Sequence, residues 1–199
     1  MYEKAPPERR QWLLFIYRVP QDSPGRRTYV WRQLKQIGAA YLQQAAAILP
    51  DRVELRAVLE TLEGRIREFE GEVSMLETAS PSQVWEAETV ARFDRARDEE
   101  YAELIENVER FEDEIARESR KEKFTFAELE ELESDWEKLQ RWRERIRVRD
   151  FFEASRLGEA NGVLERGRKA LDIFTAQVYA HEDSQEASIE FANPSEVTR

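Results

Sequence analysis

Two short apolar runs, separated by a turn and a helical pattern, constrain the fold of this chain more than any other feature. The first run, residues 12–17, stops before Pro20, and the second, residues 41–49, stops before Pro50. Apolar runs of this length that are bounded by turn residues are typical of buried strands. Apolar side chains at helical spacing lie between the runs, at Val30, Trp31, Leu34 and Ile37. Residues 11–50 therefore predict a strand, a helix and a second strand, with both strands largely buried.

The residues that follow extend this unit by one helix and one strand. Apolar side chains recur at helical spacing through residues 51–70, where Asp51 is a predicted N-cap and Gly71 a predicted stop. Residues 72–78 alternate enough in polarity to form a third strand. The order β-α-β-α-β within residues 11–80 is typical of a small ferredoxin-like sheet with its helices on one face. The sequence thus predicts an α+β fold with a ferredoxin-like head.

From Pro81 onward the chain has the pattern of helices that pack on one another. Residues 82–118 carry a heptad-like apolar stripe, and Thr125 with Glu128 forms a capping box that starts a second helix. Two such helices joined by a short break predict an antiparallel α-helical hairpin. A third helix is predicted over residues 157–179, and its glycines each cost about 1 kcal/mol relative to alanine, so that it requires tertiary packing.

These patterns divide the chain into four predicted segments. They are a frayed N-terminus at residues 1–10, the ferredoxin-like head at 11–80, a helical region at 82–180 and a disordered tail at 181–199. Both ends are polar and lack a hydrophobic period, which is typical of segments that do not pack.

Charge and residue counts limit the classes of function. The formal net charge is −11, but residues 1–70 contain 12 Lys and Arg against 9 Asp and Glu, whereas the remainder contains 19 against 33. The acidic total argues against non-specific coating of DNA and still permits a local phosphate-binding face in the head. The absence of cysteine excludes disulfides and cysteine-ligated zinc and is typical of a cytoplasmic protein. A single histidine excludes catalytic triads, and no apolar run is long enough to cross a membrane.

A cluster of basic residues surrounds the start of the first predicted helix. It comprises Arg18, Arg26, Arg27, Arg32 and Lys35. Free N–H groups and the helix dipole favour anions at a helix start, and adjacent arginines there are suited to a phosphate or another oxyanion. The alternative is that these side chains, above all Arg32 and Lys35, form an ordinary solvated helix face. The sequence leaves both interpretations open.

A second basic pattern lies in the helix that follows the capping box. Arg141, Arg145 and Arg149 recur every four residues and would line one side of that helix, near Trp142. Such a stripe is suited to the backbone of DNA. The helix predicted over residues 82–118 is strongly acidic, however, and salt bridges between the two helices are the simpler explanation of the stripe.

No catalytic or metal-binding pattern occurs in the sequence. An acidic set lies at helical spacing, but di-metal centres in helices use a Glu-x-x-His pair that the chain lacks. A solvated face explains this set better; it comprises Asp98, Glu99, Glu100, Glu103 and Glu106. A glycine-rich phosphate loop and a nucleophile elbow are also absent. We therefore predict a protein that is not an enzyme and that uses neither a metal nor another cofactor.

Several segments of the chain resemble a known family. They are WLLFIYRVP (12–20), VWRQLKQIGAAYLQQAAAILPD (30–51), FDRARDEEYAELI (93–105), RKEKFTFAELEELESDWEKLQRW (120–142) and RVRDFF (147–152). In this order and at these separations they resemble the N-terminal domain of ChrB, a family of chromate-resistance proteins that regulate bacterial chromate-efflux operons. The opening is also similar to the central domain of PaaX-type repressors and shares the ferredoxin-like plan of the small CRISPR-adaptation nuclease subunit.

The resemblance implies a transcriptional regulator that binds DNA, that binds an oxyanion such as chromate through its arginines, and that forms a homodimer through the sheet of its head. Full-length ChrB proteins continue into a second, C-terminal domain. The alternative is a non-catalytic scaffold whose helical hairpin docks another protein. A metal-dependent nuclease is the least favoured function, because nuclease relatives carry a metal-binding Asp after the aromatic residue of the first strand, whereas Arg18 follows Tyr17 here.

Overall fold

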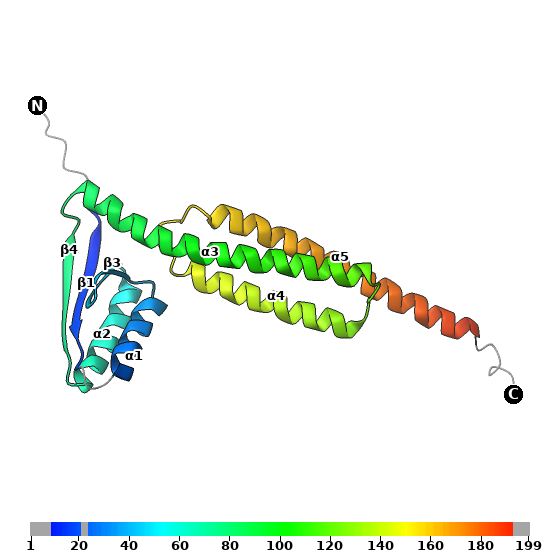
Figure 1. Cartoon of the computed structure of the whole chain (residues 1–199), viewed down its shortest axis with the longest axis horizontal. Helices are drawn as coiled ribbons and strands as arrows, with labels where there is room; N and C mark the ends of the chain where they lie inside the picture. The colour runs from blue at the N-terminus through cyan, green and yellow to red at the C-terminus, as the bar shows by residue number, and fades with distance from the viewer. Residues whose placement is uncertain (1–8, 21–23, 193–199) are drawn as a thin grey trace, which may run out of the picture. The chain divides into compact units, whose positions relative to one another are not determined.

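The structure is a computed structural model that describes residues 9–20 and 24–192 (Figure 1). The chain forms two compact units. The first consists of the described residues up to Ala96 together with Arg149–Ala154, and the second consists of Arg97–Val148 together with the described residues from Ser155 onward. Within the described ranges, no helix is long and apolar enough to span a membrane.

The first unit is built on a four-stranded antiparallel sheet with the strand order β2-β3-β1-β4. Its elements in chain order are β1 (Gln11–Arg18), α1 (Pro24–Gln36), β2 (Ala40–Gln43), β3 (Ala46–Pro50), α2 (Val53–Glu68) and β4 (Glu72–Ala79). This βαββαβ order, with β1 between β3 and β4, is that of a ferredoxin-like domain. The predicted α+β class with a ferredoxin-like head is therefore confirmed.

The second apolar run forms two strands, whereas the sequence predicts one. β2 and β3 pair as an antiparallel hairpin across Gln44 and Ala45, with a register shift between Tyr41 and Gln43. No Gly, Pro, Asn or Asp marks this turn, so the pattern predicts a continuous strand from residue 41 to residue 49. The additional strand completes the βαββαβ order.

Alternating side chains of β1 contact two different cores. Leu13 and Phe15 are fully buried against α1 and α2, in a cluster that also contains Val30, Leu34, Leu59 and Ile66. Trp12 packs on the opposite face with Ile48 and Phe93. Its ring stacks on that of Phe93 with centroids 5.9 Å apart. Apolar side chains therefore pack against both faces of the sheet near β1, whereas the sequence predicts helices on one face only.

Two segments beyond Pro81 pack on the face of the sheet opposite α1 and α2. They are the beginning of α3 (Gln83–Arg120) and residues 149–154, both of which belong to the first unit. The ring of Phe152 lies 5.3 Å from that of Phe93 and 5.9 Å from that of Trp12, measured between centroids. Because of these contacts the compact units divide within α3, whereas the sequence pattern changes at Pro81.

The start of α2 also differs from the predicted one. Arg52, not Asp51, is the N-cap residue, and it makes no side-chain capping bond. Asp51 instead accepts hydrogen bonds from the guanidinium of Arg56 at 2.5 and 2.6 Å. α2 ends before Gly71, where a Cβ atom would lie 2.5 Å from the carbonyl oxygen of Arg18. Gly71 permits this close approach of β1, and its N–H also donates to the carbonyl of Ile66 in the last turn of α2 at 2.9 Å, so that it closes the helix end as predicted.

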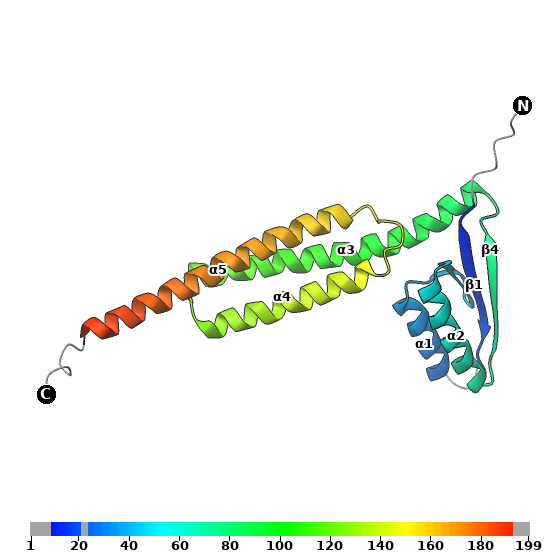
Figure 2. The ribbon, with the colours of Figure 1, turned by 180° about the vertical axis from the view of Figure 1, so that it is seen from behind.

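The second unit packs three helices around an apolar core. α4 (Phe126–Arg147) and α5 (Leu157–Ala192) run beside the part of α3 that belongs to this unit (Figure 2). The hydroxyl oxygen of Thr125 accepts a hydrogen bond from the N–H of Glu128 at 3.3 Å, which confirms Thr125 as the N-cap, while the Glu128 carboxylate pairs with Lys123 at 2.9 Å. Each helix contributes buried side chains, among them Leu104, Val108, Phe111, Leu132, Trp136, Ile146, Leu164, Leu171 and Phe174. The apolar stripe of the predicted hairpin thus packs against the third helix.

The predicted ends of the chain differ from the structure where it describes them. α5 continues to Ala192, whereas we predicted disorder from residue 181. Alanine and glutamate, which favour helices, recur through this stretch and extend α5 without a hydrophobic period. The remainder of the predicted tail, residues 193–199, and residues 1–8 of the predicted frayed N-terminus lie outside the described residues.

Candidate functional site

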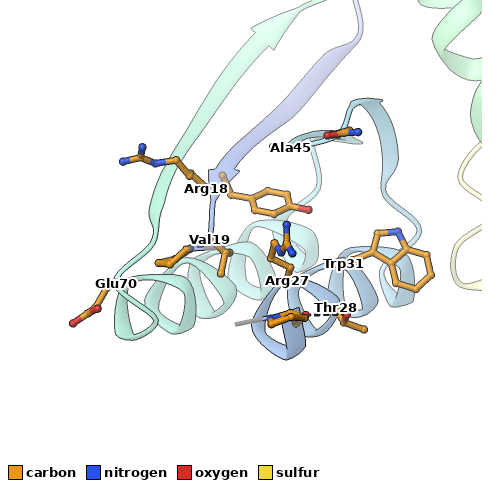
Figure 3. Close-up of a pocket in the computed structure, with 11 residues that line it drawn as sticks. Arg18, Val19, Arg27, Thr28, Trp31, Ala45 and Glu70 are labelled. Carbon is orange, nitrogen blue, oxygen red and sulfur yellow. Dashed lines mark hydrogen bonds between the residues drawn. The ribbon is translucent and has the colours of Figure 1, made fainter. Parts of the chain in front are cut away.

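An open pocket of about 910 Å³ lies in the first unit, where β1 ends and α1 begins (Figure 3). β1 ends at Arg18, and the next residue, Val19, is buried in the core and fixes the chain at this point. The β2–β3 turn and Glu70, which lies between α2 and β4, complete the wall. Polar, charged and aromatic side chains line the pocket, among them Tyr17, Arg27, Thr28, Trp31, Gln44 and Glu70.

Arg27 is the cation of this pocket. Its side chain extends from the first turn of α1 into the space (Figure 3). It is exposed, and within the described residues it forms no ion pair. The beginning of a helix favours negative charge, and a guanidinium can donate several hydrogen bonds to an oxyanion. Arg27 therefore provides a position at which an anion can bind.

Arg18 and Arg26, which the sequence groups with Arg27, are directed elsewhere. Arg18 contributes to the rim, but its guanidinium points toward β4 (Figure 3) and pairs with the carboxylate of Glu72. The guanidinium of Arg26 lies over the ring of Phe69, 5.3 Å from its centroid, and Nη1 donates to the Phe69 carbonyl at 3.4 Å. The structure therefore places one of these three arginines, not all three, with its charged group in the pocket.

Arg27, Trp31 and Lys35 form a row along one side of α1, here called the α1 row. Their spacing of four residues places them on successive turns of the helix. All three are exposed, and Trp31 keeps 49% of its surface accessible. Lys35 ends the row beside β2, with Nζ 5.9 Å from the centroid of the Tyr41 ring. Arg32 is also exposed but lies on another side of the helix.

Trp31 is a candidate functional residue that the sequence pattern groups with the apolar side chains of its helix, although its ring is half exposed. Val30 and Leu34 are the fully buried residues of α1, and Trp31 is displaced from Val30 by about 100° around the helix. The equal spacing of Trp31 from Arg27 and from Lys35 is the sequence signal that could have identified it. A large exposed aromatic side chain between two cations is typical of a ligand-contact surface.

The residues of the predicted stripe on α4 belong to two compact units. α4 ends two residues before Arg149, which belongs to the first unit and packs closely on Gly38. A Cβ atom at Gly38 would lie 2.9 Å from that of Arg149. Arg141 pairs with Glu137 of its own helix at 3.1 Å, whereas we predicted pairs with the acidic α3. Arg145 is an exposed residue of α4. Arg141 and Arg145 therefore belong to the second unit and Arg149 to the first, although the three arginines are evenly spaced in the sequence.

The acidic set in α3 includes a residue with a structural contact. One oxygen of Asp98 accepts from the backbone N–H of Arg156 at 2.8 Å, and the other accepts from the Ser155 hydroxyl at 2.9 Å. Glu100 pairs with Arg97 at 2.6 Å. In the part of the chain that the structure describes, no group of three His, Asp or Glu side chains could hold a metal ion. Asp98 thus fixes the chain that leads into α5.

Comparison with known proteins gives one family. A family model described as "Protein ChrB, N-terminal" matches residues 27–185 of the chain. The chain is also 37% identical, over 94 residues, to Protein ChrB of Cupriavidus metallidurans, and this alignment covers 47% of the chain and 28% of that protein. No solved structure matches. The match to the family model extends from the first turn of α1 into α5 and confirms the resemblance found in the sequence segments.

Proposed function

This chain belongs to the ChrB N-terminal family, and on that basis we propose that it is a non-catalytic transcriptional regulator of chromate resistance that binds DNA as a homodimer in the cytoplasm. The observation that carries the proposal is the α1 row, in which an exposed indole lies between two exposed cations. This row lies in the net basic N-terminal part of an otherwise acidic chain, since residues 1–70 have three more basic than acidic residues.

The chemistry of the α1 row suits a DNA backbone. Arg27 and Lys35 are roughly 12 Å apart along the helix axis, so each can contact a different phosphate. Charge-assisted hydrogen bonds to phosphate supply affinity, while the Trp31 ring adds contact with a sugar or a base. Because the second unit is strongly acidic, its own surface repels DNA and restricts binding to the head.

The pocket extends the proposal to an oxyanion such as chromate. A tetrahedral dianion would accept hydrogen bonds from Arg27 and be favoured by the start of α1. The Thr28 hydroxyl is already engaged, since it donates to the Pro24 carbonyl at 3.1 Å. Because Arg27 belongs to both the pocket and the α1 row, an oxyanion bound there would compete with DNA. The proposed regulator therefore releases DNA when the oxyanion concentration rises.

The two other functions considered from the sequence have less support. A scaffold that docks a partner through the helical hairpin would require an exposed apolar stripe, and the stripe residues Leu104, Val108 and Leu132 are buried in the second unit. A metal-dependent nuclease would require an anionic site at the end of β1. Arg18 occupies that position and is paired with Glu72. The proposed regulator is therefore favoured over both.

The proposal is tested by DNA binding of the full chain, measured by fluorescence anisotropy with DNA from upstream of its own gene, with and without chromate. Replacing Arg27 and Lys35 together by alanine is expected to weaken binding. It should also make the plot of log affinity against log salt less steep by about 0.9 for each lost phosphate contact. Chromate is expected to release DNA from the parent protein and to have less effect on the variant.

A matched control removes the same charge from other exposed positions. Arg67 and Arg110 each pair with a glutamate of their own helix, so their replacement by alanine leaves the α1 row intact. The control variant is expected to bind DNA with the affinity and salt dependence of the parent. Equal loss of affinity in both variants would show that net charge alone governs binding, and absence of binding by the parent would refute the proposed function.

A further inference from the structure

β4 is an edge strand of the sheet in the first unit. It is eight residues long, pairs with β1 on one side, and has no described strand on the other (Figure 1). The outer N–H and C=O groups of such a strand can accept another strand. Proteins normally protect a long edge against this pairing, so the sequence of β4 shows whether the edge is protected.

The two edges of this sheet differ in protection. β2, the opposite edge, has four residues and a register shift, both of which limit pairing with a further strand. β4 contains no proline, glycine or lysine, and its eight residues pair with β1 without interruption. β4 therefore has the properties of an edge that accepts a partner strand.

The two carboxylates of β4 form ion pairs within the first unit. The carboxylate of Glu72 pairs with Arg18, and that of Glu77 pairs with Arg56. Arg56 also pairs with Asp51 at 2.5 Å, which fixes its position beside β4. Because both glutamates of β4 are paired with arginines, they repel a second β4 strand less than two unpaired carboxylates would.

Apolar side chains of β1 and β4 are exposed on the face of the sheet opposite α1 and α2. Leu76 keeps 49% of its surface accessible, and Ile16 keeps 40%. Leu14, which is directly opposite Leu76 in the ladder, is partly buried. Leu14 and Ile16 are two residues apart in β1, and Leu76 is the ladder partner of Leu14, so all three side chains lie on the same face of the sheet. The apolar surface thus extends to the outer edge of β4.

We propose that β4 pairs with the β4 strand of a second copy of this chain, antiparallel and about a two-fold axis at Leu76. This inference rests on the proposed function, because it specifies the homodimer in which the regulator would act. The axis places Leu76 opposite its copy, Ser74 opposite Thr78, and Met75 opposite Glu77. No carboxylate then lies opposite a carboxylate, and a leucine pair lies at the centre. The strand is therefore complementary to itself, as a two-fold interface requires.

The geometry of this pairing has a consequence for DNA. A two-fold axis perpendicular to the sheet joins two four-stranded sheets into one and keeps α1 and α2 of both copies on the same face. Both α1 rows are then presented on one side of the dimer. A symmetric dimer of this kind is suited to a DNA site with two-fold symmetry.

Cysteine cross-linking in the full chain tests the interface. Because the chain contains no cysteine, Leu76→Cys introduces a single thiol at the proposed axis. Residues opposite each other in an antiparallel pair have Cβ atoms about 4.5–5.5 Å apart, so mild oxidation is expected to form an intermolecular disulfide. Val53→Cys, at a residue of α2 that is 79% exposed, is the matched control. Preferential cross-linking at Leu76 supports the interface, whereas equal or absent cross-linking at both positions contradicts it.

Sedimentation equilibrium supplies a second test that does not depend on oxidation. Leu76→Lys places two ammonium groups at the axis and is expected to raise the dimer dissociation constant roughly tenfold or more, with Val53→Lys unchanged. Leu76 is half exposed, so the variant should fold, as circular dichroism would verify. A dimer that Leu76→Lys leaves intact, or a parent that is monomeric throughout, would refute the interface. DNA binding of the same proteins is measured separately, so a wrong interface is distinguishable from a wrong function.

Discussion

Arg18 and Glu72 lie directly opposite each other in the β1–β4 ladder and form an ion pair there. The two residues are the last of β1 and the first of β4. Both side chains are largely exposed, so the pair contributes little to stability. Its importance is positional, because it directs the Arg18 guanidinium away from the pocket and leaves Arg27 as the arginine that enters it.

Oxyanion binding should accordingly depend on Arg27 and not on Arg18. Arg27→Ala is expected to weaken the binding of chromate and of sulfate, because it removes the guanidinium that extends into the pocket. Arg18→Ala and Arg26→Ala are matched controls with the same change of charge and should bind both anions like the parent. Isothermal titration calorimetry at low ionic strength measures these affinities. A loss in the Arg18 variant equal to that in the Arg27 variant would contradict the assignment.

Local patterns in the sequence predict most helices and strands to within a few residues. The apolar run at residues 12–17 forms β1, the alternation at 72–78 forms β4, and Thr125 caps the start of α4. Each signal depends on residues that are close in the sequence, so it can be recognised without the fold. The β2–β3 turn carries no such signal, because glutamine and alanine occupy it.

The candidate site depends instead on contacts between distant residues. Arg18 is 54 residues from Glu72 in the sequence, and Arg26 is 43 residues from Phe69. Glu72 of β4 and Phe69 after α2 therefore bind the side chains of Arg18 and Arg26, and Arg27 remains available to the pocket. Charge spacing along α1 contains no information about these partners. It predicts a basic region correctly and does not identify Arg27 within it.

Ser80 should stabilise the first unit through Trp12. The indole Nε1 donates to the Ser80 hydroxyl oxygen at 2.8 Å, and both residues are buried. Ser80→Ala leaves this buried N–H without its acceptor, so the free energy of unfolding is expected to fall by about 1–3 kcal/mol. Urea denaturation followed by tryptophan fluorescence measures the loss. Ser134→Ala, at an exposed position of α4, serves as the control and should change stability much less.

Glu118 should make the stability of the second unit depend on pH in the acid range. It is 5% exposed, and hydrogen bonds from Lys121 at 2.9 Å and Arg117 at 3.1 Å hold its pKa at about 2, below its ordinary value, against the opposing effect of burial. A carboxyl with a depressed pKa stabilises the fold fully above its ordinary pKa. It loses that contribution as the pH falls through the folded pKa.

The Glu118→Gln variant tests this contribution. Its Tm is expected to lie below that of the parent at neutral pH, because glutamine carries no charge to pair with Lys121, Arg117 and Lys123, whose Nζ lies 3.4 Å from the carboxylate. The difference should narrow as the pH falls from about 4.5 to about 2, where the parent carboxyl becomes protonated. Glu130→Gln, an exposed position of α4, is the control. A difference in Tm that is constant over this range would show that Glu118 acts by packing alone.

Two glycines of α5 should respond in opposite directions to replacement by alanine. A Cβ atom at Gly167 would lie 2.9 Å from Cγ1 of Val108 and 3.0 Å from Cζ3 of Trp136, both of which are buried. At Gly162, no atom lies within 4 Å of the added carbon. Alanine at Gly162 should therefore stabilise the protein by about 1 kcal/mol through helix propensity.

Alanine at Gly167 gains the same propensity, but it must displace the rigid indole of Trp136 or the side chain of Val108. Overpacking of a filled core costs about 1–3 kcal/mol, which exceeds the gain in propensity over most of that range, so the net change should be destabilising. Urea denaturation of the two variants and the parent measures both effects. The expected order of unfolding midpoints is Gly162→Ala, then the parent, then Gly167→Ala. Equal stabilisation by both substitutions would show that Val108 and Trp136 move to accommodate the added methyl group without loss of stability, and would contradict this prediction.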